Sequence, residues 1–238
     1  MPPVIWIPLL IGLAGLLGFG YYASFFIDSG VYLKARCRAS GHSDEPLLAL
    51  TFDDGPDERN TPLVLDTLAS EGVRATFFLI GERAAAHPEL VRRIVREGHL
   101  IGNHTFTHSG RSPFRSRAAI RAELEATRRT LEQITGLRTR LFRPPFGVTN
   151  PRIAAAVRDG RYDTIGWDIR PFDTRTHVSR DKILRRILDR LRPGSVVLLH
   201  DRIDGADHLV RQLLTNARRR GYRFETIDRL FHLSAYEN

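Results

Sequence analysis

Short β-rich runs alternate with helical stretches along most of this 238-residue chain, and that alternation limits the possible folds more than any other feature. Seven runs stand out, at residues 47–52, 75–80, 99–103, 141–143, 163–168, 195–200 and 222–227. Six helical stretches separate them, and glycines such as Gly72, Gly98 and Gly160 precede the next run, where a left-handed residue closes a helix. Such alternation favours a parallel sheet with handed crossovers, either closed or doubly wound. We predict an α/β fold, a distorted barrel of the (β/α)7 type with outer helices.

The first 27 residues have a different character. Residues 4–27 are uncharged and mostly apolar, which is long enough to span a bilayer. A cleaved signal peptide fits less well, because no basic residue precedes the run and the run is too long. We therefore expect one N-terminal transmembrane helix at 1–27, a linker at 28–45 and the α/β domain at 46–238.

The chain carries a formal net charge of +9, almost all of it from arginine. The arginines are scattered among glutamates, as at Arg121, Glu123 and Arg128, which is typical of solvated helix faces and argues against a nucleic-acid partner. A basic face near a membrane could instead hold anionic headgroups or attract an anionic polymer. Cys37 is the only cysteine, so no intramolecular disulfide forms, and we expect an inert thiol.

Two acids and two histidines follow predicted strands. Asp53 and Asp54 come directly after the run at 47–52, and His104 and His108 follow the run at 99–103. One carboxylate and two imidazoles leave a zinc-like ion an open position for water, and the second carboxylate can take that water's proton. Because neighbours in a strand point in opposite directions, one acid should reach the ion and the other the water. The alternative is a solvated turn with two surface histidines.

Other polar side chains follow the remaining strands, and the ends of parallel strands meet at one rim of a barrel. They are Arg143, Trp167, Asp173, His200 and Asp201. Asp201 either supports the site or caps its strand. His87 and His99 lie at element starts, where packing or capping is the simpler interpretation.

Four strings carry a resemblance to a known family: TFDDGP (51–56), HTFTH (104–108), RPPFG (143–147) and LLHD (198–201). They resemble the ordered motifs of the polysaccharide deacetylase family, the NodB-homology group of metal-dependent carbohydrate esterases. The resemblance covers roughly residues 46–230. It implies a catalytic base at Asp53 and one divalent metal ion, expected to be zinc, on Asp54, His104 and His108.

The resemblance implies further roles at the same rim. Arg143 would position the base, and His200 would be the general acid with Asp173 as its partner. Phe146 would offer its backbone N–H to the oxyanion, with Pro145 beside it. Leu198 would form a wall of the pocket for the acyl methyl group.

The chain departs from the family after the fifth strand. The family motif reads Asp-x-x-Asp-Trp, whereas here residues 170–174 read Arg-Pro-Phe-Asp-Thr. Asp173 is the second acid, Arg170 replaces the first and Thr174 replaces the tryptophan. Trp167 lies nearby and could replace the lost platform. Arg170 suggests an anionic group on the substrate.

We therefore expect a membrane-anchored zinc-dependent deacetylase that acts on an acetylated amino-sugar polymer or oligosaccharide, either peptidoglycan or a chitin-like glycan. One alternative keeps the chemistry but acts on a lipid-linked sugar. Another is a carbohydrate-binding pseudoenzyme with a structural metal. Lys34, Arg36 and Arg38 follow the anchor and favour a cytoplasmic domain by the positive-inside rule. The family acts mostly outside the cytoplasm, and we expect a single-pass protein of the cell membrane with an extracytoplasmic domain. No sequence feature indicates an oligomeric state.

Overall fold

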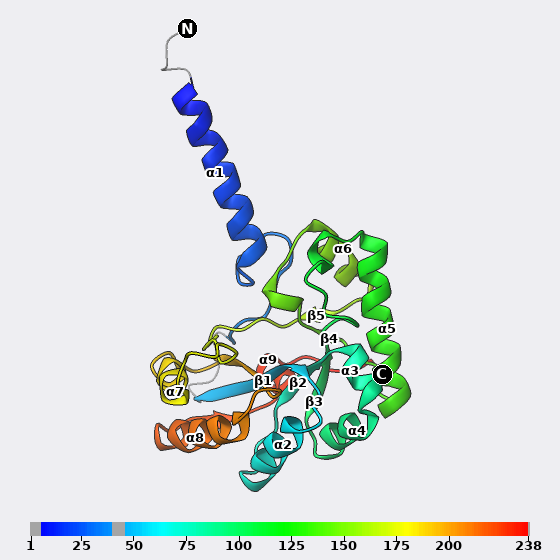
Figure 1. The fold of residues 1–238 in the computed structure, drawn as a ribbon, viewed down its shortest axis with the longest axis vertical. Coiled ribbons are helices and arrows are strands. Elements are labelled where there is room, and N and C mark those ends of the chain that lie inside the picture. The colour runs from blue at the N-terminus through cyan, green and yellow to red at the C-terminus, as the bar shows by residue number, and fades with distance from the viewer. Residues whose placement is uncertain (1–5, 40–45, 238) are drawn as a thin grey trace.

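The computed structural model describes residues 6–39 and 46–237, in which seven parallel strands lie among helices (Figure 1). All seven expected strands are present, and several are shorter than predicted. They are β1 (Leu47–Gly55), β2 (Thr76–Leu79), β3 (Leu100–Asn103), β4 (Leu141–Phe142), β5 (Asp163–Thr164), β6 (Val196–His200) and β7 (Arg223–Phe224).

The strands form one parallel sheet in the order β5-β4-β3-β2-β1-β6, and β7 pairs with the first residues of β1. The segment that follows β5 returns to β6, where Ile169 forms a bridge with Val197. This return brings the two ends of the sheet together, which confirms the distorted α/β barrel. Strand β1 lies between β2 and β6, so a strand flanks its carboxyl end on each side at the rim.

Helices cover the outside of the sheet. They are α2 (Asn60–Ser70), α3 (Gly81–Ala86), α4 (Pro88–Arg96), α5 (Arg117–Thr135), α6 (Pro151–Asp159), α7 (Arg180–Leu188) and α8 (Ala206–Arg219). The short helix α9 (Ile227–Phe231) instead packs on the inner side, where Ile227 and Leu230 join the cluster of Ala49. The single helix expected between β2 and β3 is two helices, because Pro88 lacks an N–H and disfavours helical backbone at His87. Gly160 is not left-handed as expected, since its φ is −79°, whereas Gly72 and Gly98 are.

Alternate residues of β1 pack on opposite sides of the sheet. Leu50 and Phe52 belong to the core between the strands and the helices, whereas Ala49 packs in a second cluster with Phe78 and Val196. Thr51 and Asp53 therefore lie on the side of Ala49, inside the barrel. Thr51 and Asp53 thus form a line of polar side chains inside the barrel that ends at the rim.

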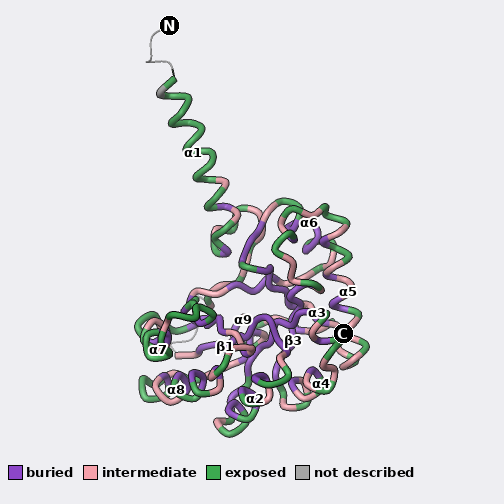
Figure 2. Tube along the Cα trace, in the orientation of Figure 1, coloured by how far each residue is buried: buried purple, intermediate pink, exposed green. Residues whose placement is uncertain are grey.

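The N-terminal helix α1 (Trp6–Phe25) is exposed along most of its length, and burial begins only at its base (Figure 2). Its residues 8–25 are long and apolar enough to cross a membrane. The segment expected to be a linker pairs with the barrel, because Arg36 forms a bridge with Ile165 and Arg38 with Ser195. Free backbone groups of the barrel thereby gain partners. The rest of that segment, residues 40–45, lies outside the described residues.

Candidate active site

The end of β1 places two carboxylates beside one imidazole. Nε2 of His104 lies 3.4 Å from Oδ1 of Asp54 and 3.8 Å from Oδ2 of Asp53. The expected alternation of the two acids is therefore wrong at this position. Asp54 has a φ of 71°, in the left-handed region, and this turn of the backbone brings both carboxylates to the same side.

The donor atoms of Asp54, His104 and His108 all lie within 4.8 Å of one another. Nδ1 of His104 donates to the carbonyl oxygen of Arg143 at 2.8 Å, which directs Nε2 into the site. Nε2 of His108 lies 3.3 Å from Oδ1 of Asp54. One carboxylate and two imidazoles with one shared focus are a donor set that fits a zinc-like divalent ion.

The protonation states of Asp54 and His108 agree with a role as metal ligands. Burial alone would raise the pKa of Asp54, but the hydrogen bond from His104 and the charges of His104, His108 and His200 hold that pKa well below its usual range. Burial and the charge of His104 lower the pKa of His108 to about 4. His108 is therefore neutral at neutral pH, with a nitrogen lone pair free for a metal.

Arg143 is fully buried and makes five hydrogen bonds with its guanidinium and backbone carbonyl on the rim side of the barrel. Its Nη1 donates to Oδ1 of Asp53 at 2.7 Å and to the hydroxyl of Thr51 at 2.8 Å. The other guanidinium nitrogens donate to the carbonyl oxygens of Ile165 and Gly166. With its charge paired and four of its five guanidinium N–H groups donating, Arg143 fixes the orientation of Asp53.

On the other side of Asp54, Asp173 holds His200 with both carboxylate oxygens. One accepts from the backbone N–H of His200 at 2.8 Å, and the other lies 3.0 Å from Nδ1 of its ring. Burial lowers the pKa of His200, but the hydrogen bond and charge of Asp173, with the charges of Asp53 and Asp54, outweigh it and raise the pKa above its ordinary value. Nε2 of His200 lies 3.9 Å from Oδ2 of Asp54 and faces the cluster.

An aromatic rim borders the two histidines. The half-exposed ring of Phe146 lies 4.7 Å from that of His108, and Pro145 beside it is buried. The Trp167 ring packs closely on Gly147, and the guanidinium of Arg170 lies 5.6 Å from that ring. Leu198 is buried in β6, on the same strand face as His200. The structure thus brings every predicted site residue to one end of the barrel.

Left-handed backbone is concentrated on the loops that carry these residues. Of the seven non-glycine residues with positive φ in the described ranges, five lie there: Asp54, Thr105, His108, Phe146 and Phe172. Bulky side chains adopt this conformation at a cost of about 1–3 kcal/mol each, and such strain is concentrated at functional sites.

Sequence reasoning missed two arginines that hold Asp54. Nε of Arg202 donates to Oδ2 of Asp54 at 3.0 Å, and Nη1 of Arg83 donates to its carbonyl oxygen at 3.0 Å. Arg202 directly follows the LLHD string, and that adjacency was the available signal. Arg83 carries no signal in the sequence, because only the packing of α3 brings it to the end of β1.

The interpretation of α5 as a solvated face was wrong for two residues. The carboxylate of Glu123 accepts from the backbone N–H groups of Phe106 and Thr107, and so holds the loop that ends in His108. Arg128 is buried and donates to the hydroxyl of Tyr162 at 2.7 Å. Both face the barrel because α5 packs along β3, which its charge pattern does not reveal.

The remaining singled-out groups have structural contacts. Asp201 is buried, accepts from the hydroxyl of Thr61 at 2.5 Å and lies against Gly55, and burial raises its pKa to about 6. His99 is buried and accepts from the backbone N–H of Ala75. Burial raises the pKa of the Cys37 thiol to about 11, in keeping with an inert thiol.

Comparisons with known proteins agree with this geometry. Residues 40–165 match the family model described as "Polysaccharide deacetylase". A peptidoglycan-N-acetylglucosamine deacetylase of Bacillus cereus is 34% identical over 203 residues, 82% of this chain and 72% of that protein. A chitooligosaccharide deacetylase of Sinorhizobium fredii is 38% identical over 170 residues, 71% of this chain and 78% of that protein.

Solved structures are also similar. A peptidoglycan N-acetylglucosamine deacetylase superposes with a TM-score of 0.77 at 32% identity, over 84% of this chain and 94% of that one. A pseudoenzyme of the CE4 family from Bacillus anthracis superposes with a TM-score of 0.74 at 27% identity, over 82% of this chain and 67% of that one. Proteins with this fold therefore include both active enzymes and an inactive relative.

Proposed function

The chain belongs to the polysaccharide deacetylase family and is a hydrolase of non-peptide amide bonds, and from this premise we propose that it is a membrane-anchored, zinc-dependent deacetylase of an amino-sugar polymer. The substrate is peptidoglycan or a chitin-like glycan. Residues 1–27 anchor the domain of residues 46–238 on the outer side of the cell membrane, and residues 28–45 connect the two.

One observation carries the proposal. A carboxylate held by Arg143 and an imidazole held by Asp173 flank the same three-ligand cluster, with His104 and His200 each within 4 Å of a carboxylate oxygen of Asp53 or Asp54. A structural metal needs ligands only, whereas this arrangement adds a proton acceptor and a proton donor. The presence of both Asp53 and His200 therefore favours catalysis over the pseudoenzyme alternative.

The roles follow from which atoms are free. A divalent ion on Asp54, His104 and His108 would polarise the acyl carbonyl and make water nucleophilic near neutral pH. Asp53 accepts the proton of the attacking water, while Arg143 keeps the carboxylate in one orientation. The tetrahedral oxyanion accepts a hydrogen bond from the backbone N–H of Phe146.

The leaving group is an amine, which cannot depart as an anion. His200 donates a proton to its nitrogen, and Asp173 keeps the imidazole charged. Leu198 and Pro145 bound the acyl methyl group, and Trp167 supports the sugar. Arg170 extends from the Trp167 ring toward an anionic group on the substrate.

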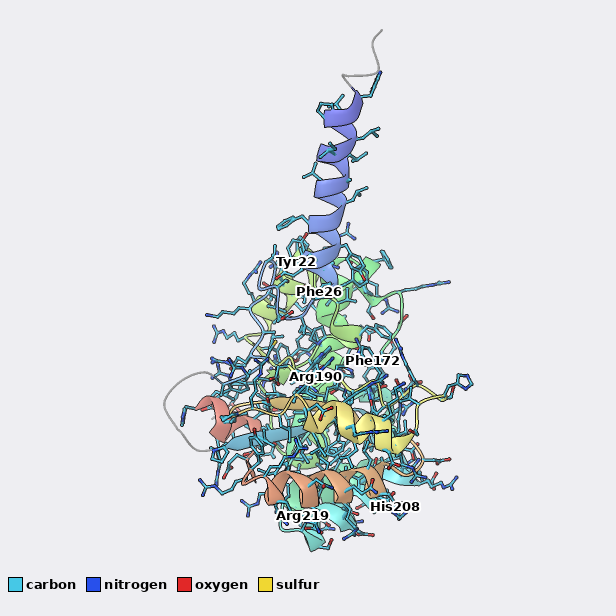
Figure 3. The ribbon with its side chains drawn as sticks, turned by 90° about the vertical axis from the view of Figure 1, so that its left-hand side faces the viewer. Tyr22, Phe26, Phe172, Arg190, His208 and Arg219 are labelled. Atoms are coloured by element: carbon cyan, nitrogen blue, oxygen red, sulfur yellow. The ribbon has the colours of Figure 1, made fainter. Side chains whose placement is uncertain are left out.

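The test is acetate release from N-acetyl chito-oligosaccharides by purified enzyme before and after metal removal. We expect activity to disappear with a chelator and to return with zinc. His200→Ala should lose activity on this amide, and the matched variant His208→Ala should not, because the side chain of His208 is 70% exposed and lies beside Asp207 on α8 (Figure 3). Binding of the oligosaccharide without acetate release would favour the pseudoenzyme.

A further inference from the structure

The last turn of α1 is packed against the catalytic domain. Ala23 is fully buried and Ile27 is only 5% exposed, although most of α1 is exposed. Thr149 holds this end of the helix, because its backbone N–H donates to the carbonyl oxygen of Ser24 at 2.8 Å and its hydroxyl donates to that of Ala23 at 3.1 Å. These hydrogen bonds satisfy carbonyl groups that a helix end leaves without partners.

The chain beyond α1 is fixed as well. The hydroxyl of Ser29 donates back to the carbonyl oxygen of Ala23. Farther on, the backbone N–H of Arg36 donates to Thr164 at 2.9 Å, and that of Gly166 donates to Arg36 at 3.0 Å. Contacts before and after the C-terminal end of α1 thus fix the helix to the barrel, and we call residues 23–36 with these contacts the mount. A flexible tether would instead leave the helix and the barrel free to move relative to each other.

This mount touches the loop that borders the candidate active site. A Cβ placed on Gly147 would lie 2.6 Å from the Trp167 ring and 3.7 Å from Cβ of Ile27. Thr149 follows Phe146 by three residues, which span at most roughly 11 Å. The Phe146 ring lies 4.7 Å from that of His108. The metal-ligand cluster is therefore on the order of 20 Å from the end of α1.

The position of a bilayer follows from the length of α1. A helix of 20 residues is about 30 Å long, which matches the hydrocarbon core of a membrane. Tyr22 and Phe26 lie at its base and are exposed, where interfacial aromatic residues belong (Figure 3). If α1 spans the membrane as proposed, the headgroup layer begins at the mount.

A second surface feature lies beside the mount. Phe114 is 81% exposed, more than any other large apolar side chain in the described residues. Asn150, next to Thr149, donates to the carbonyl oxygen of Pro113, and Arg152 donates to that of Phe114. The exposed ring of Phe114 and the arginine beside it, Arg152, are side chains suited to the headgroup layer of an anionic bilayer.

We propose that the mounted helix holds the mouth of the active site at the bilayer surface and that the acetylated amino-sugar chain on which the enzyme acts is one still carried by a membrane lipid. A rigid mount cannot reach glycan strands far from the membrane, but it meets a lipid-borne sugar at a high local concentration. This inference rests on the proposed deacetylase function and on the proposed membrane anchor.

The test uses the full-length zinc-loaded protein in lipid nanodiscs. One acetylated chito-oligosaccharide is supplied in three forms: free in solution, attached directly to a lipid in the same disc, and attached through a long polyethylene glycol spacer. We expect the wild type to hydrolyse the directly attached form about tenfold faster than the spaced form at equal surface density. Ile27→Asp, which places a charge in the mount, should lose that preference and keep its rate on the free saccharide.

Val31→Asp is the matched control, because Val31 is an exposed apolar residue of the same segment. It should behave as the wild type. Thr149→Val, which removes only the hydroxyl donor to Ala23, is a milder variant in case Ile27→Asp does not fold, and it should weaken the preference. Hydrogen exchange at the Thr149 amide gives a readout apart from activity: slow in the wild type and Val31→Asp, fast in Ile27→Asp.

The outcomes separate the two proposals. Hydrolysis of the free saccharide without any preference for the directly attached form would overturn the lipid-borne substrate and leave the deacetylase function intact. Fast exchange at Thr149 in the wild type would overturn the mount itself. Absence of hydrolysis of all three forms, with Thr149 protected, would overturn the deacetylase function and, with it, the lipid-borne substrate.

Discussion

The guanidinium of Arg143 donates to Oδ1 of Asp53 at 2.7 Å, and Arg143 has no exposed surface. The remaining oxygen, Oδ2, lies 3.8 Å from Nε2 of His104. One oxygen of Asp53 is therefore used for orientation and the other is turned to the metal-ligand cluster. This division of the two oxygens underlies the first two predictions.

Asp53→Asn should retain the metal and lose about 10²–10⁴-fold in kcat, the usual contribution of a general base. The amide oxygen can still accept from Arg143, so the site keeps its shape, but it cannot take a proton. KM should change little, because the base acts mainly in the transition state. Zinc content, Tm and kcat on one preparation check this. Asp66→Asn, at an exposed ion pair with Arg93, is the matched control. A folded, metal-loaded Asp53→Asn enzyme with normal turnover would refute the assignment.

Arg143→Ala should destabilise the fold, because it leaves the charge of Asp53 buried without a partner. Removal of one member of a buried ion pair costs about 3–5 kcal/mol in the free energy of unfolding. Arg129→Ala, which removes an exposed i,i+4 pair with Glu125, should cost only about 0.3–0.5 kcal/mol. Urea denaturation of the two variants measures the difference. Similar losses would mean that Arg143 contributes no more than a surface arginine.

Asp54→Ala, His104→Ala and His108→Ala should each lose most of the bound zinc and essentially all activity. Three protein ligands leave no redundancy in a site that keeps a position open. Metal analysis after dialysis measures the loss, with His208→Ala as an exposed control. Stoichiometric, tightly held zinc in all three variants would place the ion elsewhere.

His200→Ala should slow hydrolysis of amides far more than that of aryl acetate esters. An aryl oxide departs without a proton, so an ester bypasses the step that His200 serves. Asp173→Asn should show a milder form of the same bias. Parallel rate measurements on both substrates decide the matter, and equal losses would exclude His200 as the acid.

The pH profile should depend on Asp173. Its hydrogen bond and charge raise the pKa of His200 against the opposing effect of burial, so Asp173→Asn should lower that pKa and move the alkaline limb of the rate profile to lower pH. Because the folded pKa lies above the unfolded one, the imidazolium stabilises the fold below the unfolded pKa. That stabilisation is lost as pH rises through the folded pKa. Tm of metal-free wild type and Asp173→Asn should therefore converge at alkaline pH, and a constant gap would contradict this origin.

The alternation of short apolar runs with helices was sufficient to predict the barrel, because each strand ends at the same rim. It also placed Asp53, Asp54, His104 and His200 near one another without any knowledge of contacts. What it could not supply depends on tertiary structure. The left-handed backbone of Asp54 is sustained by contacts of its loop, and Arg83 approaches from a helix.

Prediction of helix faces failed for a related reason. Glu123 and Arg128 lie among charged residues that look solvated in sequence, yet α5 turns them toward a loop and a tyrosine hydroxyl. A buried charge is recognisable only by the partner that compensates it, and that partner is distant along the chain. The split between α3 and α4 at Pro88, in contrast, was readable from the proline itself.

The bridges of residues 36–39 decide where a shortened, soluble version of this protein should begin. A fragment that starts at residue 46 would strip Arg36 from Ile165 and Arg38 from Ser195, leaving backbone groups of the barrel open to pairing with other molecules. It would also uncover Gly166, against which the Cys37 sulfur lies. A fragment that starts between Gly30 and Ala35 keeps these contacts while it omits the apolar helix, and is the version less prone to aggregate.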